Sequence, residues 1–176
     1  MITERLRLRK LTPEVYDYVH AHLSENELMD FLALNSLEEL AREKEKYRKG
    51  LSTYNRSFLN FQMIDKATGQ IIGACGFHTW YTEHNRAEIG YALLADDYKG
   101  KGWMSEALKP ILHYGFNSMG LHRIEAFVGP GNIPSLKLME KMKFVREGQL
   151  MEHYFKNGRA EDSIVFSLLK QEYSID

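Results

Sequence analysis

The spacing of the apolar residues changes sharply near residue 100, and this change constrains the fold more than any other feature. Before it, residues 58–65 and 70–80 flank a short turn at 66–69, a pattern typical of a β-hairpin. After it, apolar residues recur every three or four positions, as on the buried face of a helix: Met104, Ala107, Leu108, Ile111, Leu112, Gly115 and Met119. Paired strands and a long helix must therefore share the fold.

The remaining segments extend this pattern to the whole chain. We predict strands at 4–11, 86–94, 123–128, 144–155 and 160–169, and helices at 14–23, 36–49 and 133–142, whereas 24–35 is ambiguous. Ser36 and Glu39 predict a capping box, and Pro110 predicts a kink or one lost hydrogen bond in its helix. Asn157-Gly158 predicts a tight turn. This order indicates a mixed α/β sheet with helices on its faces.

Length and charge narrow the class of protein. The 176 residues suit one domain, 1–176, and the net charge of −1 gives no field that would attract nucleic acid or a membrane. The basic residues near the N-terminus alternate with leucines, which predicts a strand with one wet face. With no apolar leader and no run long enough to span a bilayer, we expect a cytoplasmic protein.

Neither cysteine nor histidine indicates a metal centre. Cys75 is the only cysteine, so disulfides and cysteine-based zinc sites are excluded, and its apolar neighbours predict a small buried side chain. His20 and His22 would face different sides of a helix, and His78 and His84 lie in or near a hairpin. We therefore expect no metal.

The stretch from Asp97 to Met104 indicates an anion site. Gly100 and Gly102 allow close approach of the backbone and unusual torsions, and the helix that follows presents free N–H groups. Together these features suit a pyrophosphate, although a simple turn explains the glycines as well. The nucleoside-triphosphate loop and the dinucleotide fingerprint do not fit, because Trp103 and Ser105 stand where each requires another residue.

At these residues the chain resembles the GCN5-related N-acetyltransferase (GNAT) family. The glycine loop Gly100-Lys101-Gly102 opens a long helix, as in the family signature. More narrowly, the chain is similar to the RimJ/RimL-like branch, which acetylates N-termini of ribosomal proteins. The resemblance spans nearly the whole chain, and the matching stretches are 4–9, 86–91, 100–107, 132–135 and 144–148.

The resemblance implies a fold and an acetyl-CoA site. The fold would be a mostly antiparallel sheet of about seven strands flanked by about four helices, with the fourth and fifth strands splayed apart. The pantetheine arm would lie along the backbone of Ala92, Leu93 and Leu94, with Leu93 N–H facing the oxyanion. The pyrophosphate would meet the amides of Lys99, Gly100, Lys101, Gly102, Trp103 and Met104. Asn132 would also contact the cofactor, although it is equally a good N-cap.

The resemblance also suggests the catalytic groups. Glu88 matches the position proposed for the base that deprotonates the acceptor amine; the alternative is a surface or structural carboxylate paired with Arg86 or with a neighbouring strand. Many relatives protonate the leaving thiolate with a tyrosine, but the expected position holds Met139. Ser135, near the expected sulfur, is then the candidate acid, unless it only bonds its own helix. Tyr91 and Tyr154 are alternative donors. Lys143 stands where relatives usually have a glycine that ends the helix.

The resemblance thus implies an N-acetyltransferase that moves the acetyl group of acetyl-CoA to a primary amine by direct attack in a ternary complex. The expected acceptor is the N-terminal amine of a protein or peptide, and the protein would be a monomer or homodimer. Two alternatives stay open. One is acetylation of a polyamine, amino sugar or drug, and the other is a non-catalytic module that senses acyl-CoA.

Overall fold

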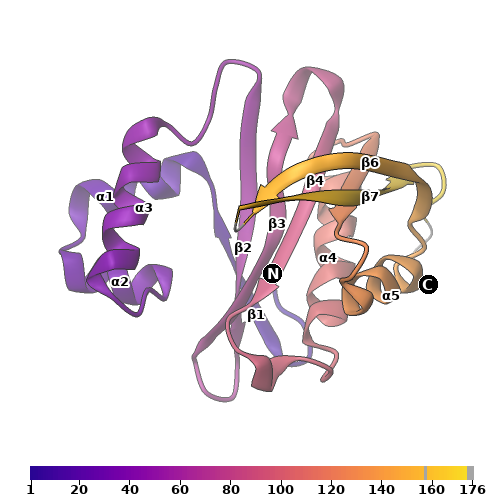
Figure 1. Ribbon diagram of the computed structural model, residues 1–176. Helices are drawn as coiled ribbons and strands as arrows, with labels where there is room; N and C mark the ends of the chain where they lie inside the picture. The colour runs from indigo at the N-terminus through magenta and orange to yellow at the C-terminus, as the bar shows by residue number, and fades with distance from the viewer. Residues whose placement is uncertain (157, 174–176) are drawn as a thin grey trace.

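The computed structural model describes residues 1–156 and 158–173, which fold as a seven-stranded sheet with helices on both sides. Figure 1 shows α1, α2 and α3 together on one side of β2 and β3, and α4 and α5 on the other. The elements are β1 (Leu6–Leu11), α1 (Pro13–His22), α2 (Glu25–Leu32), α3 (Leu37–Lys49), β2 (Arg56–Asp65), β3 (Ile71–Tyr81), β4 (Arg86–Leu93), α4 (Trp103–Asn117), β5 (Arg123–Val128), α5 (Ile133–Lys141), β6 (Val145–Lys156) and β7 (Arg159–Leu169).

The strand order is β1-β2-β3-β4-β5-β7-β6. Every neighbouring pair is antiparallel except β4 and β5, which run parallel. The mixed, mostly antiparallel sheet that the sequence predicted is therefore confirmed, with five α-helices over the described residues where about four were expected. The single parallel pair matters for function, because β4 and β5 are paired over only three residues and separate beyond them.

The main core lies between the sheet and α4. The apolar stripe predicted for this helix is its buried face, except that Met119 follows the end of the helix and is only partly buried. Leu108, Ile111 and Leu112 pack against sheet residues such as Phe61 and Phe77. Burying a side chain of this size stabilises the fold by about 1.5–3 kcal/mol. The helix continues through Pro110, which lacks an N–H and so removes one hydrogen bond from it.

The three N-terminal helices have a small core of their own. Val19, Leu28 and Leu40 each come from a different helix and form it together. The middle helix, α2, was not predicted, although a complete capping box between Ser24 and Glu27 starts it. The box predicted for α3 is only half formed, because the carboxylate of Glu39 accepts the N–H of residue 35 instead of residue 36.

Helix α5 ends in a left-handed turn at Lys143, whose φ is +62°. The N–H of Phe144 donates to Met139 O at 3.0 Å, and the N–H of Lys143 donates to Glu140 O at 2.9 Å. The glycine-like turn thus forms although a lysine occupies it. The tight turn predicted at Asn157-Gly158 stays a prediction, since Asn157 lies outside the described residues.

Across the described residues, none of the helices combines the length and apolar character needed to cross a membrane.

Candidate active site

The β4–β5 pair opens into a pocket because its pairing stops early. Cα partners run from Arg86–Arg123 to Glu88–Glu125, while β4 continues to Leu93 and β5 to Val128. The predicted splay between these strands is therefore present. A pocket of about 270 Å³ lies where they part, lined by His78, Glu88, Ile89, Gly90, Tyr91, Ala126, Phe127, Val128, Gly129, Asn132, Ser135 and Tyr154. Backbone groups that face this gap have no strand to pair with and are free for a ligand.

Glu88 is the last residue of β4 that pairs with β5, so it lies where the two strands begin to separate. Its side chain is only 14% exposed, and Oε1 lies 3.0 Å from His78 Nε2. Of the two structural partners that the sequence suggested, Arg86 binds Glu125 instead, whereas the neighbouring strand β3 does provide a partner, His78. The Glu88 carboxylate therefore borders the pocket without a lysine or arginine bound to it among the described residues.

Tyr154 contacts the same carboxylate oxygen. Its hydroxyl donates to Glu88 Oε1 at 3.5 Å. Burial raises the pKa of Tyr154, and the negative charge of Glu88 raises it further, so the phenol keeps its proton at neutral pH. The Glu88 carboxylate thus contacts one imidazole and one phenol, and both of these groups can rearrange their hydrogen bonds when the carboxylate is protonated.

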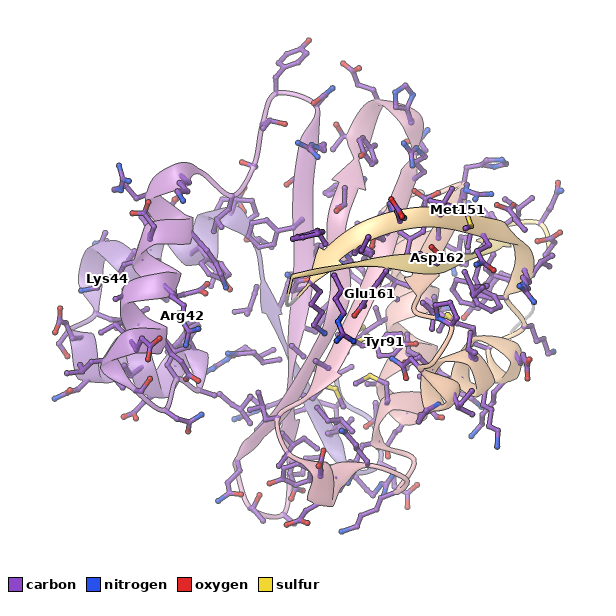
Figure 2. The ribbon with its side chains drawn as sticks, viewed as in Figure 1. Arg42, Lys44, Tyr91, Met151, Glu161 and Asp162 are labelled. Carbon is purple, nitrogen blue, oxygen red and sulfur yellow. The ribbon has the colours of Figure 1, made fainter. Side chains whose placement is uncertain are left out.

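A bulge in β6 brings Tyr154 to this position. Residues 151–153 stand opposite the single residue Asp162 of β7, between the pairs Leu150–Ser163 and Tyr154–Glu161. Asp162, labelled in Figure 2, stabilises the bulge by accepting the N–H of Glu152 at 2.8 Å, where the backbone is left-handed at φ +48°. The extra residues re-aim the strand, as bulges beside active sites commonly do.

Ser135 and Asn132 reach the pocket from the start of α5. Asn132 is the N-cap, and its Oδ1 accepts the N–H of Ser135 at 3.2 Å. The predicted cap is therefore formed, and the Asn132 amide N–H groups are not used by it. Both residues line the pocket together with Glu88. Met139, one turn further along, is completely buried in the main core, so this position offers no proton.

Tyr91, on β4 and labelled in Figure 2, adds a hydroxyl to this part of the pocket. The hydroxyl oxygen is buried and has no hydrogen-bond partner of good geometry in the described part of the chain. Burial raises the pKa of Tyr91, and the nearby Ser135 side chain opposes part of that rise. A buried donor without a partner costs free energy, so this hydroxyl is suited to a bound ligand.

The glycine loop before α4 has the features of an anion site. Gly100 and Gly102 have φ of +71° and +80°, a conformation that side chains disfavour. Gly102 is the N-cap of this 15-residue helix and provides no side-chain cap, so the N–H groups of the first turn remain available. Free N–H groups at the start of a helix suit a phosphate or another anion.

The side chains around this loop divide into core and surface. Met104 packs in the core, and Trp103 lies under Arg5, whose guanidinium is 4.0 Å from the ring centroid. Only the backbone of these two residues can therefore belong to a phosphate site. Lys99 and Lys101 are exposed, and Lys99 pairs with Asp96 at 2.5 Å. Sequence reasoning missed Arg5, which donates to Lys101 O at 3.2 Å.

Ala92 and Leu93 at the end of β4, and Leu94 just after it, differ in what they can offer a pantetheine arm. The N–H of Leu94 donates to Ile72 O at 3.0 Å on the neighbouring strand and is not available to a ligand. Backbone groups alternate in direction along a strand, so the N–H of Leu93 points away from β3 and toward the splay, whereas that of Ala92 points to β3. Of these three residues, Leu93 has the N–H best placed for a ligand.

His78 and Cys75 both lie on β3. Sequence reasoning overlooked His78 as a site residue, because its place depends on strand register and not on any motif. Cys75, on β3, is 1% exposed, and burial raises the pKa of its thiol, so it is a packing residue. Among the described residues, no three His, Cys, Asp or Glu side chains are grouped to hold a metal ion.

Comparison with known proteins agrees with this geometry. Residues 5–145 match the family model described as an acetyltransferase (GNAT) domain. The chain is 38% identical over 176 residues to an uncharacterized N-acetyltransferase of Bacillus licheniformis called p20, covering 99% of this chain and 98% of that protein. The chain therefore belongs to the GNAT family and is an acetyltransferase. Enzymes of this family generally use acetyl-CoA.

Two other similarities concern acceptors. A putative ribosomal N-acetyltransferase of Bacillus subtilis, YdaF, is 30% identical over 105 residues, which is 60% of this chain and 57% of that protein. The structure of a spermidine/spermine N-acetyltransferase from Vibrio cholerae, SpeG, superposes with a TM-score of 0.70 at 26% identity, covering 96% of each chain. Proteins similar to this chain thus carry names that indicate two kinds of acceptor.

Proposed function

We propose that the protein moves the acetyl group of acetyl-CoA to a primary amine by direct attack in a ternary complex, and that the amine is the N-terminus of a protein or peptide. The observation that carries this proposal is the pocket at the β4–β5 splay, which brings the carboxylate of Glu88 and the hydroxyl of Ser135 together. Direct transfer needs a base for the amine and a proton donor for the thiolate in one place.

Acetyl-CoA supplies a thioester whose acetyl group an amine can attack. The chain would hold its pyrophosphate with the N–H groups of residues 99–104, at the uncapped start of α4. The N–H of Leu93 is the donor for the acetyl carbonyl oxygen, whose negative charge grows during the transfer. Asn132 would use its free amide N–H groups toward the cofactor.

Glu88 is the proposed base. An α-amine has a reference pKa near 8 and a lysine amine one near 10.4, so an N-terminal amine loses its proton to a carboxylate more readily. The absence of a lysine or arginine ion pair on Glu88, over the described residues, supports this role. Ser135 is the proposed donor to the departing sulfur, and the buried hydroxyl of Tyr91 beside it can supply or share that proton.

The edge of the sheet next to the pocket supports a polypeptide acceptor. Strand β6 is the last strand of the sheet and is exposed along its whole length, with large apolar side chains such as Met151 and Phe155. An exposed edge offers unpaired backbone groups that an extended peptide can join. Tyr154 on the same strand reaches Glu88, so a peptide on this edge would bring its N-terminus close to the base.

A polyamine is the second candidate acceptor. It is supported by the similarity to the spermidine/spermine enzyme of Vibrio cholerae over 96% of this chain. The same base and cofactor site would serve both reactions, so the difference lies in the acceptor surface alone.

One experiment separates these functions. Coenzyme A release from acetyl-CoA is measured with peptides of different N-termini, spermidine, spermine, amino acids and aminoglycosides, and acetyl-CoA binding is measured by calorimetry in parallel. Peptide-dependent release, with intersecting initial-rate plots when both substrates vary, supports the proposal. Release with polyamines alone supports the second candidate. Tight acetyl-CoA binding without release in any mixture contradicts both and supports a sensor.

A further inference from the structure

His78 occupies an irregular position that places its ring beside Glu88. Phe77 pairs with Ile89 and Thr79 pairs with Glu88, so His78 is an extra residue in β3, a β-bulge. Its ring lies over Gly90, where a Cβ atom would come within 2.5 Å of His78 Nδ1. Glycine at position 90 therefore leaves the space that the imidazole occupies, and the Nε2 atom reaches Glu88 Oε1 at 3.0 Å.

The same imidazole connects two pockets. It lines the pocket at the splay, and it also lines a second, polar pocket of about 230 Å³ formed by Gly50, Leu51, Ser52, Thr53, Arg56, Ser57 and Thr79. The His78 side chain is 44% exposed, whereas that of Glu88 is 14% exposed. His78 thus borders both pockets and is the more exposed of the two side chains.

We propose that His78 is a proton-relay residue that returns Glu88 to its ionised form after each transfer. This proposal rests on the proposed function, in which Glu88 takes a proton from the acceptor amine. Acetylation of a protonated amine gives an amide, a thiol and one proton, which must reach water. Histidine is the side chain best suited to accept and release a proton near neutral pH.

The steps balance without any other reagent. The ammonium N–H bond breaks and its proton goes to a Glu88 carboxylate oxygen. The resulting carboxylic acid gives the proton to the lone pair of His78 Nε2. The imidazolium then loses the Nδ1 proton to water, which leaves the ring neutral as the other tautomer, and exchange with water restores the first. Nothing is oxidised or reduced, and His78 acts only through Glu88.

The other titratable or charged groups around the ring come from three strands. Glu88 and Tyr91 on β4 and Tyr154 on β6 line the first pocket with it, and Arg56 on β2 lines the second. Tyr154 donates its hydrogen bond to the same carboxylate oxygen that His78 contacts, so it cannot accept the proton from Glu88 while it holds its own. Of His78 and the groups around it, only His78 has a basic nitrogen that can be free to take the proton of Glu88.

Two substitutions separate a relay from a simple support. His78→Gln keeps an amide N–H for the Glu88 carboxylate but cannot pass a proton, and His78→Ala removes both functions and leaves room for a small base. We expect both to lower kcat at pH 7 by about tenfold or more with unchanged acetyl-CoA affinity. Added imidazole should restore His78→Ala, and the rescue should grow with the unprotonated fraction of imidazole as the pH rises.

His84→Ala is the matched control, because His84 is an exposed histidine just beyond the same strand and lines neither pocket. It should keep the wild-type rate and gain nothing from imidazole beyond the enzyme-free background. A His78→Gln enzyme with the wild-type rate, or a His78→Ala enzyme that is unimpaired or not rescued, overturns the relay. A wild-type protein that binds acetyl-CoA but acetylates no amine overturns the proposed function, and the relay with it.

Discussion

Glu106, in the first turn of α4, holds Arg5 through two hydrogen bonds. One carboxylate oxygen accepts the backbone N–H of Arg5 at 2.7 Å, and the other accepts Nε at 2.6 Å. The same guanidinium covers the ring of Trp103. The residue just before β1 is thereby tied to the start of α4, where the proposed pyrophosphate site lies.

Arg5→Ala should therefore weaken both the fold and cofactor binding. It leaves a largely buried carboxylate without its cation, which should lower the free energy of unfolding by about 1–3 kcal/mol. Acetyl-CoA affinity should fall about 3- to 10-fold, because the loop loses a support. Urea unfolding and calorimetry measure the two effects. Arg7→Ala, an exposed arginine on β1, is the control, and equal behaviour of the two variants would refute the link.

Gly102→Val should abolish most of the affinity for coenzyme A. A β-branched residue at φ +80° is strained, and its side chain would cover the N–H groups at the start of α4. We expect at least about a tenfold rise in the dissociation constant, which corresponds to about 1.4 kcal/mol.

Gly120→Val controls for the strain in that experiment. Gly120 has φ +69° and nothing within 4 Å of the position of a Cβ atom, whereas a Cβ atom at Gly102 would make an ordinary 3.6 Å contact with Arg5 Nη2; Gly120 follows α4 at the opposite end. Both variants should lose similar stability, and only Gly102→Val should lose affinity. Unchanged affinity in Gly102→Val would remove the loop from the cofactor site.

Ser135→Ala should slow turnover without loss of cofactor affinity. Its hydroxyl is the proposed proton donor, while its N–H keeps the bond to Asn132 that caps α5. We expect kcat to fall about tenfold or more, with Ser118→Ala as the control on an exposed serine. Tyr91→Phe tests the neighbouring hydroxyl in the same assay. If Ser135→Ala loses binding in place of turnover, the serine is a cofactor contact and not an acid.

Lys143→Gly should stabilise the protein. A residue with a Cβ atom at φ +62° costs about 1–2 kcal/mol, and glycine removes that cost while adding freedom to the unfolded chain. The net gain should be about 0.5–1 kcal/mol in the free energy of unfolding, measured in urea. Lys143→Ala keeps the Cβ atom and should show no such gain, so equal stabilities of the two variants would argue against strain at this turn.

Much of the fold could be predicted because periodicity reports burial directly. The buried face of α4 and the paired strands follow from spacing alone. Helix α2 was missed, because it is short and Leu28 is its one buried residue, so its apolar pattern is weak. Its capping box was present in the sequence at Ser24 and Glu27 and could have identified its start.

The candidate site was predictable only in part. Resemblance to a family located Glu88, Asn132 and Ser135, and the structure brings them to one pocket. The place of His78 was not predictable, since it depends on which residue of β3 forms the bulge. Tyr154 reaches Glu88 only because three residues of β6 bulge opposite Asp162, and strand register of this kind is set by tertiary packing.

The most direct test of the account is the turnover of Glu88→Gln, measured with the best acceptor alongside an acetyl-CoA titration. Glutamine keeps the size and the hydrogen-bonding capacity of the side chain but cannot take the proton. We predict that kcat/KM falls about 100-fold or more with an unchanged dissociation constant for acetyl-CoA, while Glu83→Gln, an exposed residue between β3 and β4, behaves as wild type. A Glu88→Gln enzyme that acetylates the same amine at the wild-type rate would contradict the assignment of the base and of the pocket around it.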